Sequence, residues 1–230
     1  MKRLLALLLI TSVVISVSVS AKKVHTIGDS TMATYDETSD KRGWGQMFNQ
    51  FFTDEIVVNN RAKSGSSSKS FYNEAPYWAT VKTQIVAGDY VLIQFAHNDE
   101  KNNGYDGDEL QAAYPDSLIA DTRGTAPFTT YKEYLRKYVE ETRALDATPI
   151  LVTPIVRRYF SGGKITQKGR HNLSAEGEHD LDYVMAMKEV AQEMNVLLID
   201  HTELTAQLVE AYGDVDSKAQ LYVKETSASN

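Results

Sequence analysis

The chain has 230 residues, 42% of them hydrophobic and 24% charged, which is typical of one globular domain and excludes disordered, collagen-like and multi-span membrane proteins. Its 31 acidic residues outnumber its 24 lysines and arginines, and the net charge of −7 argues against a nucleic-acid partner, whose phosphates need clustered cations. The sequence contains no cysteine, so disulfides, thiolate zinc sites and a catalytic cysteine are excluded.

The first 21 residues differ from the rest of the chain. Lys2 and Arg3 precede a long apolar run, and Val19-Ser20-Ala21 then offers small residues for a cleavage after Ala21. These are the three parts of a secretory signal peptide, whereas the run is short and weakly apolar for the alternative, an uncleaved membrane anchor. We expect residues 1–21 to be a signal peptide and residues 22–230 to be one secreted or periplasmic domain, with no membrane contact after cleavage.

Short apolar and β-branched runs alternate with amphipathic stretches along the rest of the chain. The predicted strands cover residues 24–27, 55–58, 90–95, 149–153 and 196–199, and the predicted helices cover residues 44–52, 78–86, 130–145 and 181–194. Strands that alternate with helices favour a parallel sheet with helices on both faces. We therefore expect an α/β fold, a three-layer α/β/α sandwich with a five-stranded parallel sheet of the flavodoxin-like kind.

Two long connections, 97–128 and 154–179, each leave the carboxyl end of a predicted strand. Loops of this length are usually functional or disordered. Ligands of open α/β sheets bind beyond the carboxyl ends of the strands. Both connections are therefore expected to overhang the functional site.

Polar groups follow each of the first three predicted strands. Ser30 comes at the end of Gly28-Asp29-Ser30, Gly65 lies in the turn after the second strand, and Asn98 follows the third. Because the carboxyl ends of parallel strands share one edge of the sheet, we expect a hydroxyl, a glycine amide and a carboxamide to lie together. Singly, each residue is more simply interpreted as a cap, a turn or a loop contact; the three in register favour a site.

These three groups suit acyl transfer. Ser30 would attack an ester carbonyl and form an acyl-enzyme. The backbone N–H groups of Ser30 and Gly65 and the side-chain amide of Asn98 would donate to the oxyanion. Glycine suits such a position because no side chain blocks the approach of a ligand to the backbone.

Several blocks of the sequence resemble those of one enzyme family. They lie at residues 27–32, 43–45, 60–62, 65–67, 95–101, 130–132 and 153–158. Together they are similar to the successive blocks of SGNH (GDSL) hydrolases and, more narrowly, of rhamnogalacturonan acetylesterases, which remove acetyl groups from the pectin backbone. The resemblance implies the roles already given to Ser30, Gly65 and Asn98, and no metal or cofactor. Ala96 departs from the family, which usually has glycine there.

The resemblance also implies a general base that the sequence lacks. The family takes this base from an Asp-x-x-His block near the C-terminus, where this chain has Ser227 and Asn230, and the terminal helix that follows the block is missing too. We transfer no role to these positions. Without a base, a serine hydroxyl is a poor nucleophile, and only the residual catalysis of the oxyanion hole and of binding remains, roughly 10³–10⁴ over water.

Four other histidines follow predicted strands at the same edge, namely His97, His171, His179 and His201. His97 adjoins the site in sequence, but neighbouring residues on a strand point to opposite sides. His171 and His179 lie in the second long connection. His201 follows Asp200, and this pair is more simply interpreted as a helix start with Asp200 as its N-cap. None of the four is assigned as the base.

We expect the domain to be a truncated form of a secreted carbohydrate esterase that removes acetyl groups from pectin-type polysaccharide by serine acyl transfer. One alternative is a catalytically silent glycan-binding protein of the same fold, and another is an enzyme with unusual catalytic machinery. A third is a lipid-directed acylhydrolase, although no apolar lid-like stretch lies near the strand ends. The expected partner is an acetylated plant cell-wall polysaccharide or oligosaccharide.

Three further groups have two interpretations each. The acidic stretch 99–109 could hold Ca²⁺, but its spacing does not fit an EF-hand and favours a solvated loop. Either Arg157 or Arg158 could meet a uronate carboxylate, or both could be surface residues. The aromatic residues Tyr72, Tyr77 and Trp78 could stack on sugar rings or pack in the core. The serine-rich stretch 64–70 is interpreted as a tight loop that opens a helix.

Overall fold

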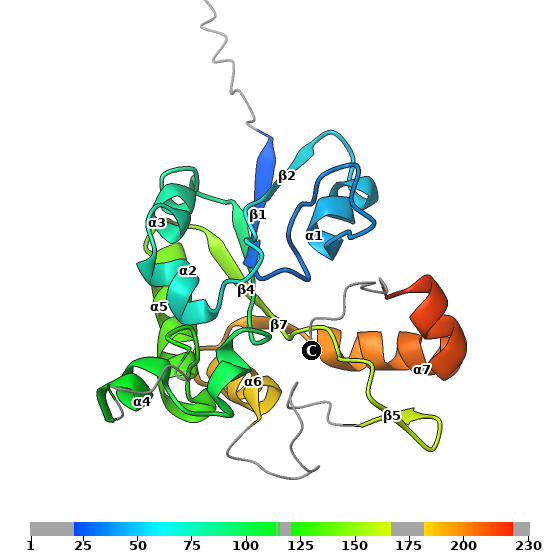
Figure 1. Ribbon diagram of the computed structural model, residues 1–230. Helices are drawn as coiled ribbons and strands as arrows, with labels where there is room; N and C mark the ends of the chain where they lie inside the picture. The colour runs from blue at the N-terminus through cyan, green and yellow to red at the C-terminus, as the bar shows by residue number, and fades with distance from the viewer. Residues whose placement is uncertain (1–20, 114, 116–120, 167–181, 223–230) are drawn as a thin grey trace, which may run out of the picture.

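The structure is a computed structural model that describes residues 21–113, 115, 121–166 and 182–222. Five parallel strands form its main sheet in the order β2-β1-β3-β4-β7 (Figure 1). They are β1 (Lys22–Gly28), β2 (Ile56–Asn60), β3 (Tyr90–Gln94), β4 (Thr148–Val152) and β7 (Leu197–Ile199). Each corresponds to a predicted strand, so the expected α/β fold with a five-stranded parallel sheet is confirmed.

Helices cover both faces of this sheet. One face is covered by α2 (Ser68–Asn73), α3 (Tyr77–Lys82), α5 (Lys132–Arg143) and α6 (Tyr183–Glu193). The other face carries the short helix α1 (Trp44–Met47) and the 3-10 turn η1 (Phe48–Phe51), beside which α7 (His201–Gln220) begins. The helix predicted at 130–145 starts with one π-helical turn, η3 (Pro127–Tyr131).

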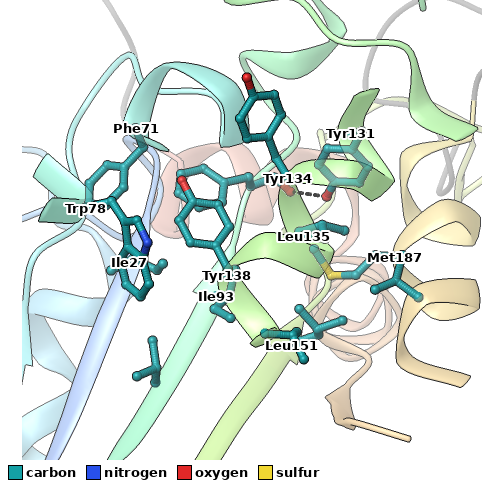
Figure 2. Close-up of a cluster of buried hydrophobic side chains, with 14 of the residues drawn as sticks. Ile27, Phe71, Trp78, Ile93, Tyr131, Tyr134, Leu135, Tyr138, Leu151 and Met187 are labelled. Atoms are coloured by element: carbon teal, nitrogen blue, oxygen red, sulfur yellow. Dashed lines mark hydrogen bonds between the residues drawn. The ribbon is translucent and has the colours of Figure 1, made fainter. Parts of the chain in front are cut away.

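The main core lies between the sheet and the helices α2, α3, α5 and α6, as Figure 2 shows. Leu135 and Tyr138 of α5 project onto it because three-residue spacing places them on one helix face. The ring of Trp78 packs edge-on against Tyr138 at a centroid distance of 5.0 Å, and the Tyr138 hydroxyl donates to the Ser68 carbonyl at 2.8 Å. Trp78 is therefore a core residue and does not stack on sugars.

The strand order reverses direction beside β1. From β1 the chain passes to β2 at the sheet edge and then returns to β3 on the opposite side of β1. The loops after β1 and β3 therefore diverge at this point, and the carboxyl edge beside such a reversal is where open α/β sheets bind ligands.

Both long connections contain structure that the sequence did not predict. The first holds the 3-10 turn η2 (Asp99–Asn102) and the helix α4 (Gly107–Ala113). The second contains an antiparallel hairpin of β5 (Phe160–Ser161) and β6 (Lys164–Ile165). A small separate core joins this hairpin to α7, with Ile165 next to Ala206 and Val209.

Several predicted features lie outside the described residues. These are the signal peptide up to residue 20, His171 and His179 in the second long connection, and the positions Ser227 and Asn230. Over the described ranges, no helix has both the length and the apolar character needed to cross a membrane.

Replacing Leu135 by alanine should lower the free energy of unfolding by about 2–5 kcal/mol, because the side chain is fully buried and its loss leaves a cavity. Leu204→Ala is the matched control, since this leucine is also helical but 56% exposed, and it should cost well under half as much. Urea unfolding followed by circular dichroism measures both. Equal losses for the two variants would contradict the assigned core.

Candidate active site

The turn after β1 places Ser30 at the carboxyl edge of the sheet. The Asp29 carboxylate fixes this turn by accepting hydrogen bonds from the backbone N–H and the hydroxyl of Thr31, at 2.9 and 2.7 Å. Tyr35 donates its hydroxyl to the Ser30 carbonyl at 2.7 Å. Gly28 is required just before the turn, because a Cβ there would lie 2.5 Å from the Gln94 carbonyl oxygen. Ser30 is left half-buried at the edge.

Gly65 lies in the turn that follows β2. The chain continues beside β1 past the end of the strand, with the N–H of Lys63 donating to the Gly28 carbonyl at 2.9 Å. It then turns as Ser66 N–H donates to the Lys63 carbonyl at 3.2 Å. Gly65 has a φ of +85°, in the left-handed region that glycine adopts without strain. Helix α2 follows with Ser67 as its N-cap, which confirms the predicted tight loop opening a helix.

Asn98 is buried at the carboxyl end of β3 and is tied to the Gly65 turn. Its side-chain nitrogen donates to the Ser66 carbonyl at 2.9 Å. Beside it, the Asp99 carboxylate accepts hydrogen bonds from the backbone N–H of Ser68 at 3.1 Å and from the Thr125 hydroxyl at 2.9 Å. These contacts bring the Asn98 loop and the Gly65 turn together. Ser30 lies in the turn that follows β1, the strand between β2 and β3.

Three polar hydrogens at this edge have no acceptor among the described residues. Within the described part of the chain, no acceptor pairs with the backbone N–H of Ser30 or with that of Gly65. The Asn98 amide carries two hydrogens, and to the described residues it donates one hydrogen bond, to the Ser66 carbonyl. The Ser30 hydroxyl also makes no hydrogen bond to a described residue. Hydrogen-bond donors that lack partners next to a half-buried hydroxyl are what an anion-stabilising site requires.

Burial dominates the electrostatics behind this edge. It raises the pKa of the Asp99 carboxyl to about 7, although hydrogen bonds from Ser68 and Thr125 oppose the shift. Burial likewise raises the pKa of Glu100 to about 7, against the opposing charge of Arg157. The interpretation of 99–109 as a solvated loop is wrong for Asp99 and also for Asp106, which is buried in an ion pair with Lys69 at 3.1 Å.

The histidines near the site are held away from the Ser30 hydroxyl. A ring nitrogen of His97 lies 3.0 Å from the Ile155 carbonyl, and burial lowers the pKa of this imidazole. His201 packs edge-on against Trp44, and burial lowers its pKa to about 4. Asp200 caps α7, as predicted, by accepting from the Glu203 N–H at 3.2 Å. None of the histidines in the described ranges hydrogen-bonds to Ser30.

Arg157 and Arg158, either of which could meet a uronate by sequence, both form ion pairs with acidic residues. Arg157 forms an ion pair with the buried Glu100, and Arg158 forms one with Asp214. A different arginine, Arg123, reaches the site from the first long connection and donates to the Gly65 carbonyl at 2.9 Å. No sequence pattern marks Arg123. The first long connection therefore does approach the site.

Across the described ranges, no three histidine or acidic side chains are grouped closely enough to hold a metal ion.

Comparisons with known proteins show the family to which the chain is similar. The profile of the GDSL-like Lipase/Acylhydrolase family matches residues 26–219. Rhamnogalacturonan acetylesterase RhgT of Bacillus subtilis is 35% identical over 198 residues, which cover 85% of this chain and 72% of that protein. A probable rhamnogalacturonan acetylesterase of the same organism, YesY, is 33% identical over 183 residues. The match covers 80% of this chain and 71% of YesY.

Solved structures share the fold. The Bacillus subtilis protein YXIM superposes with a TM-score of 0.66 at 22% identity, over 89% of this chain and 50% of that one, so this chain spans half of its length. The acetylxylan esterase Axe2 of Geobacillus stearothermophilus gives a TM-score of 0.53 at 21% identity, over 83% of this chain and 81% of its own. At these identities the likeness concerns the fold alone.

Asp99→Asn should flatten the dependence of stability on pH. Because burial raises the pKa of this carboxyl from 3.8 to about 7, the native state holds a proton that the unfolded chain releases. The stability from Asp99 is thus full below about pH 4 and is lost as the pH rises through 7. Urea unfolding between pH 4 and 7.5 should show a smaller decline in the variant than in the unaltered chain.

The matched control is Asp36→Asn, because Asp36 is exposed and hydrogen bonds from Thr38 lower its pKa. This variant should retain the decline. If Asp99→Asn declined as steeply as the unaltered protein, the buried and protonated state of Asp99 would be wrong.

Proposed function

The chain belongs to the GDSL-like lipase/acylhydrolase family of carboxylic ester hydrolases, and we propose that it removes acetyl groups from a pectin-type polysaccharide by acyl transfer to Ser30. The observation that supports the mechanism is a set of three donors without partners among the described residues, at the sheet edge where Ser30 lies and where the strand order reverses. Family membership alone leaves the acyl group and the alcohol open.

The proposed reaction has two steps. The Ser30 oxygen attacks the acetyl carbonyl carbon, and the negative charge that develops on the carbonyl oxygen is stabilised by Ser30 N–H, Gly65 N–H and the Asn98 amide. The bond between the carbonyl carbon and the sugar oxygen then breaks. The sugar oxygen takes up the proton that the Ser30 hydroxyl lost, and the sugar leaves as an alcohol. Water then attacks the acetyl-enzyme, which releases acetate and restores the serine.

The choice of acetyl ester and polysaccharide rests on the curated relatives. Rhamnogalacturonan acetylesterases at 35% and 27% identity come from a bacterium and from Emericella nidulans, and they cover 85% and 96% of this chain. The N-terminal segment supports the same proposal, because a basic start, an apolar run and small residues before position 22 suit export to the place where plant cell-wall polymers are found. We propose that the protein is secreted or periplasmic.

No histidine in the described ranges is placed to act as the general base for Ser30. His97 and His201 are occupied by the Ile155 carbonyl and by the Trp44 ring, and neither contacts the Ser30 hydroxyl. This observation favours one second candidate, a glycan-binding protein of the same fold without turnover. Activity measurements separate the two.

The unaltered protein should hydrolyse p-nitrophenyl acetate faster than the oxyanion donors and binding alone allow, and Ser30→Ala should reduce the rate to that residual level, roughly 10³–10⁴ over water, because the nucleophile is lost. Acetate release from acetylated rhamnogalacturonan should fall in parallel. The measurement is steady-state kinetics on folded protein, with circular dichroism to confirm the fold. A Ser30→Ala variant that keeps its rate would overturn the serine mechanism, whereas an inactive unaltered protein would favour the glycan-binding candidate.

Asn98→Ala should lower kcat by roughly 10²–10³, the usual cost of removing one oxyanion donor. Asn73→Ala provides a matched control, because Asn73 is exposed and its side chain, on α2, donates to the Tyr134 hydroxyl on α5. The control should keep kcat within about twofold. An Asn98→Ala variant with unchanged kcat and normal stability would remove this residue from the oxyanion site.

A further inference from the structure

One buried glutamine joins the turn of Ser30 to the helix on one face of the sheet. Gln94 is the last residue of β3, is fully buried and lies opposite Gly28 in the pairing with β1. Its side chain is on the face that α1 covers, because Leu92, two residues earlier, packs there. The acyl transfer proposed above gives Gln94 no role.

Hydrogen bonds run in one direction through the Gln94 amide. The indole N–H of Trp44, on α1, donates to Gln94 Oε1 at 2.7 Å. Gln94 Nε2 donates to the Thr31 hydroxyl at 2.6 Å. This hydroxyl in turn donates to Asp29 Oδ1 at 2.7 Å. We call these four residues, Trp44, Gln94, Thr31 and Asp29, the Gln94 network.

Trp44 fixes the direction of the Gln94 network. An indole N–H can only donate, so it selects the oxygen of the Gln94 amide and turns the NH₂ group toward Thr31. The Thr31 oxygen then accepts from Gln94, and its one hydrogen is left for Asp29. A residue of α1 thus determines the direction in which the hydroxyl next to Ser30 points.

The Asp29 carboxylate depends on this hydroxyl. Its Oδ1 accepts from the hydroxyl and the backbone N–H of Thr31, whereas its Oδ2 is buried without a hydrogen bond to a described residue. Because a buried carboxylate needs its hydrogen bonds, the loss of one would favour a different turn. Ser30 lies between Asp29 and Thr31, so a different turn would move the nucleophile and its N–H together.

We propose that Gln94 is a positioning residue for the reaction: through Thr31 and Asp29 it holds the turn in which the hydroxyl and the N–H of Ser30 face the ester. This inference rests on the proposed acetylesterase function and adds a determinant of its rate that does not contact the reacting atoms. Because the network places the nucleophile and does not bind the sugar, its loss should lower kcat and leave KM within about twofold.

Gln94→Glu tests the direction of the network at nearly constant shape. An ionised carboxylate accepts from both Trp44 and Thr31, which takes the Thr31 hydrogen away from Asp29. A protonated carboxyl can accept from Trp44 and donate to Thr31, as the glutamine does. Burial and the Asp29 charge should raise the pKa of the introduced carboxyl above its ordinary value of about 4.3. The variant should therefore recover as the pH falls.

The readout is kcat for p-nitrophenyl acetate, as the ratio of Gln94→Glu to the unaltered protein. The ratio should be about one tenth at about pH 8 and should rise to within about threefold of unity at about pH 5. A ratio equally low at both pH values would show a merely structural defect and would overturn the proposal. Circular dichroism confirms that each variant is folded at both pH values.

Two imidazoles lie near the Gln94 network. A ring nitrogen of His201, at the start of α7, is 3.4 Å from Gln94 Oε1, and His97 feels the charge of Asp29. Burial lowers the pKa of both imidazoles, that of His201 to about 4. The unaltered protein carries both as well, so the ratio of the two rates at each pH reports the introduced carboxyl.

Thr31→Val and Thr31→Ser are a second pair of variants. Valine has the shape of threonine without its hydroxyl, so Thr31→Val should lower kcat about tenfold at both pH values. Serine keeps the hydroxyl, and Thr31→Ser should retain kcat within about threefold. Equal rates in the two variants would overturn the role of the hydroxyl.

Gln84→Glu is the matched control. Gln84 follows α3 on the other face of the sheet, and its Oε1 also accepts a side-chain hydrogen bond, from the Asn59 amide at 2.9 Å. This variant adds the same charge in a similar contact and should keep kcat within about twofold. An equal fall in Gln84→Glu and Gln94→Glu would show that added charge alone lowers the rate, which contradicts positioning.

Backbone amide NMR separates this proposal from the proposed function. Between about pH 5 and about pH 8, the amide signals of Ser30 and Thr31 should move further in Gln94→Glu than in the unaltered protein. Such movement in a protein without esterase activity would leave the hold of Gln94 on the turn standing and overturn the proposed function. Esterase activity with a normal kcat in Gln94→Glu at about pH 8 would overturn the positioning alone.

Discussion

The geometry of the candidate site depends on the buried carboxylate of Asp99. It accepts hydrogen bonds from the backbone and hydroxyl of Ser68 and from the hydroxyl of Thr125, and so it joins the end of β3 to the start of α2 and to the connection before α5. Asn98 directly precedes Asp99, and Gly65 lies three residues before Ser68. One side chain therefore fixes two of the proposed oxyanion donors relative to each other, and parallel pairing with β1 adds the third.

Two of the cations in this acidic protein are paired with buried carboxylates. Lys69 and Arg157 pair with the buried carboxylates of Asp106 and Glu100, and there they stabilise the loops that surround the site. Arg61 and Lys63 instead line a cavity without a carboxylate.

The sequence predicted the sheet well, because buried parallel strands are continuous apolar runs and the polar residues after them must meet at one edge. Ser30 and Asn98 could be placed in this way from their positions after strands. The role of Arg123 could not, since it contacts the carbonyl of Gly65, which lies 58 residues earlier in the chain, and no sequence pattern marks the connection that holds Arg123. The burial of Asp99 was also missed, because its partners come from distant segments, whereas the local sequence is simply acidic.

Asp29 leaves one of its two carboxylate oxygens buried without a hydrogen bond to any described residue. An unsatisfied buried acceptor typically costs about 1–3 kcal/mol, a considerable share of the margin by which a domain of this size stays folded. This cost in free energy arises in the turn that presents Ser30, where a turn with all its polar groups hydrogen-bonded would be more stable. Substitutions that relax this turn would raise the heat tolerance of the protein, and they would do so by moving the serine that its chemistry needs.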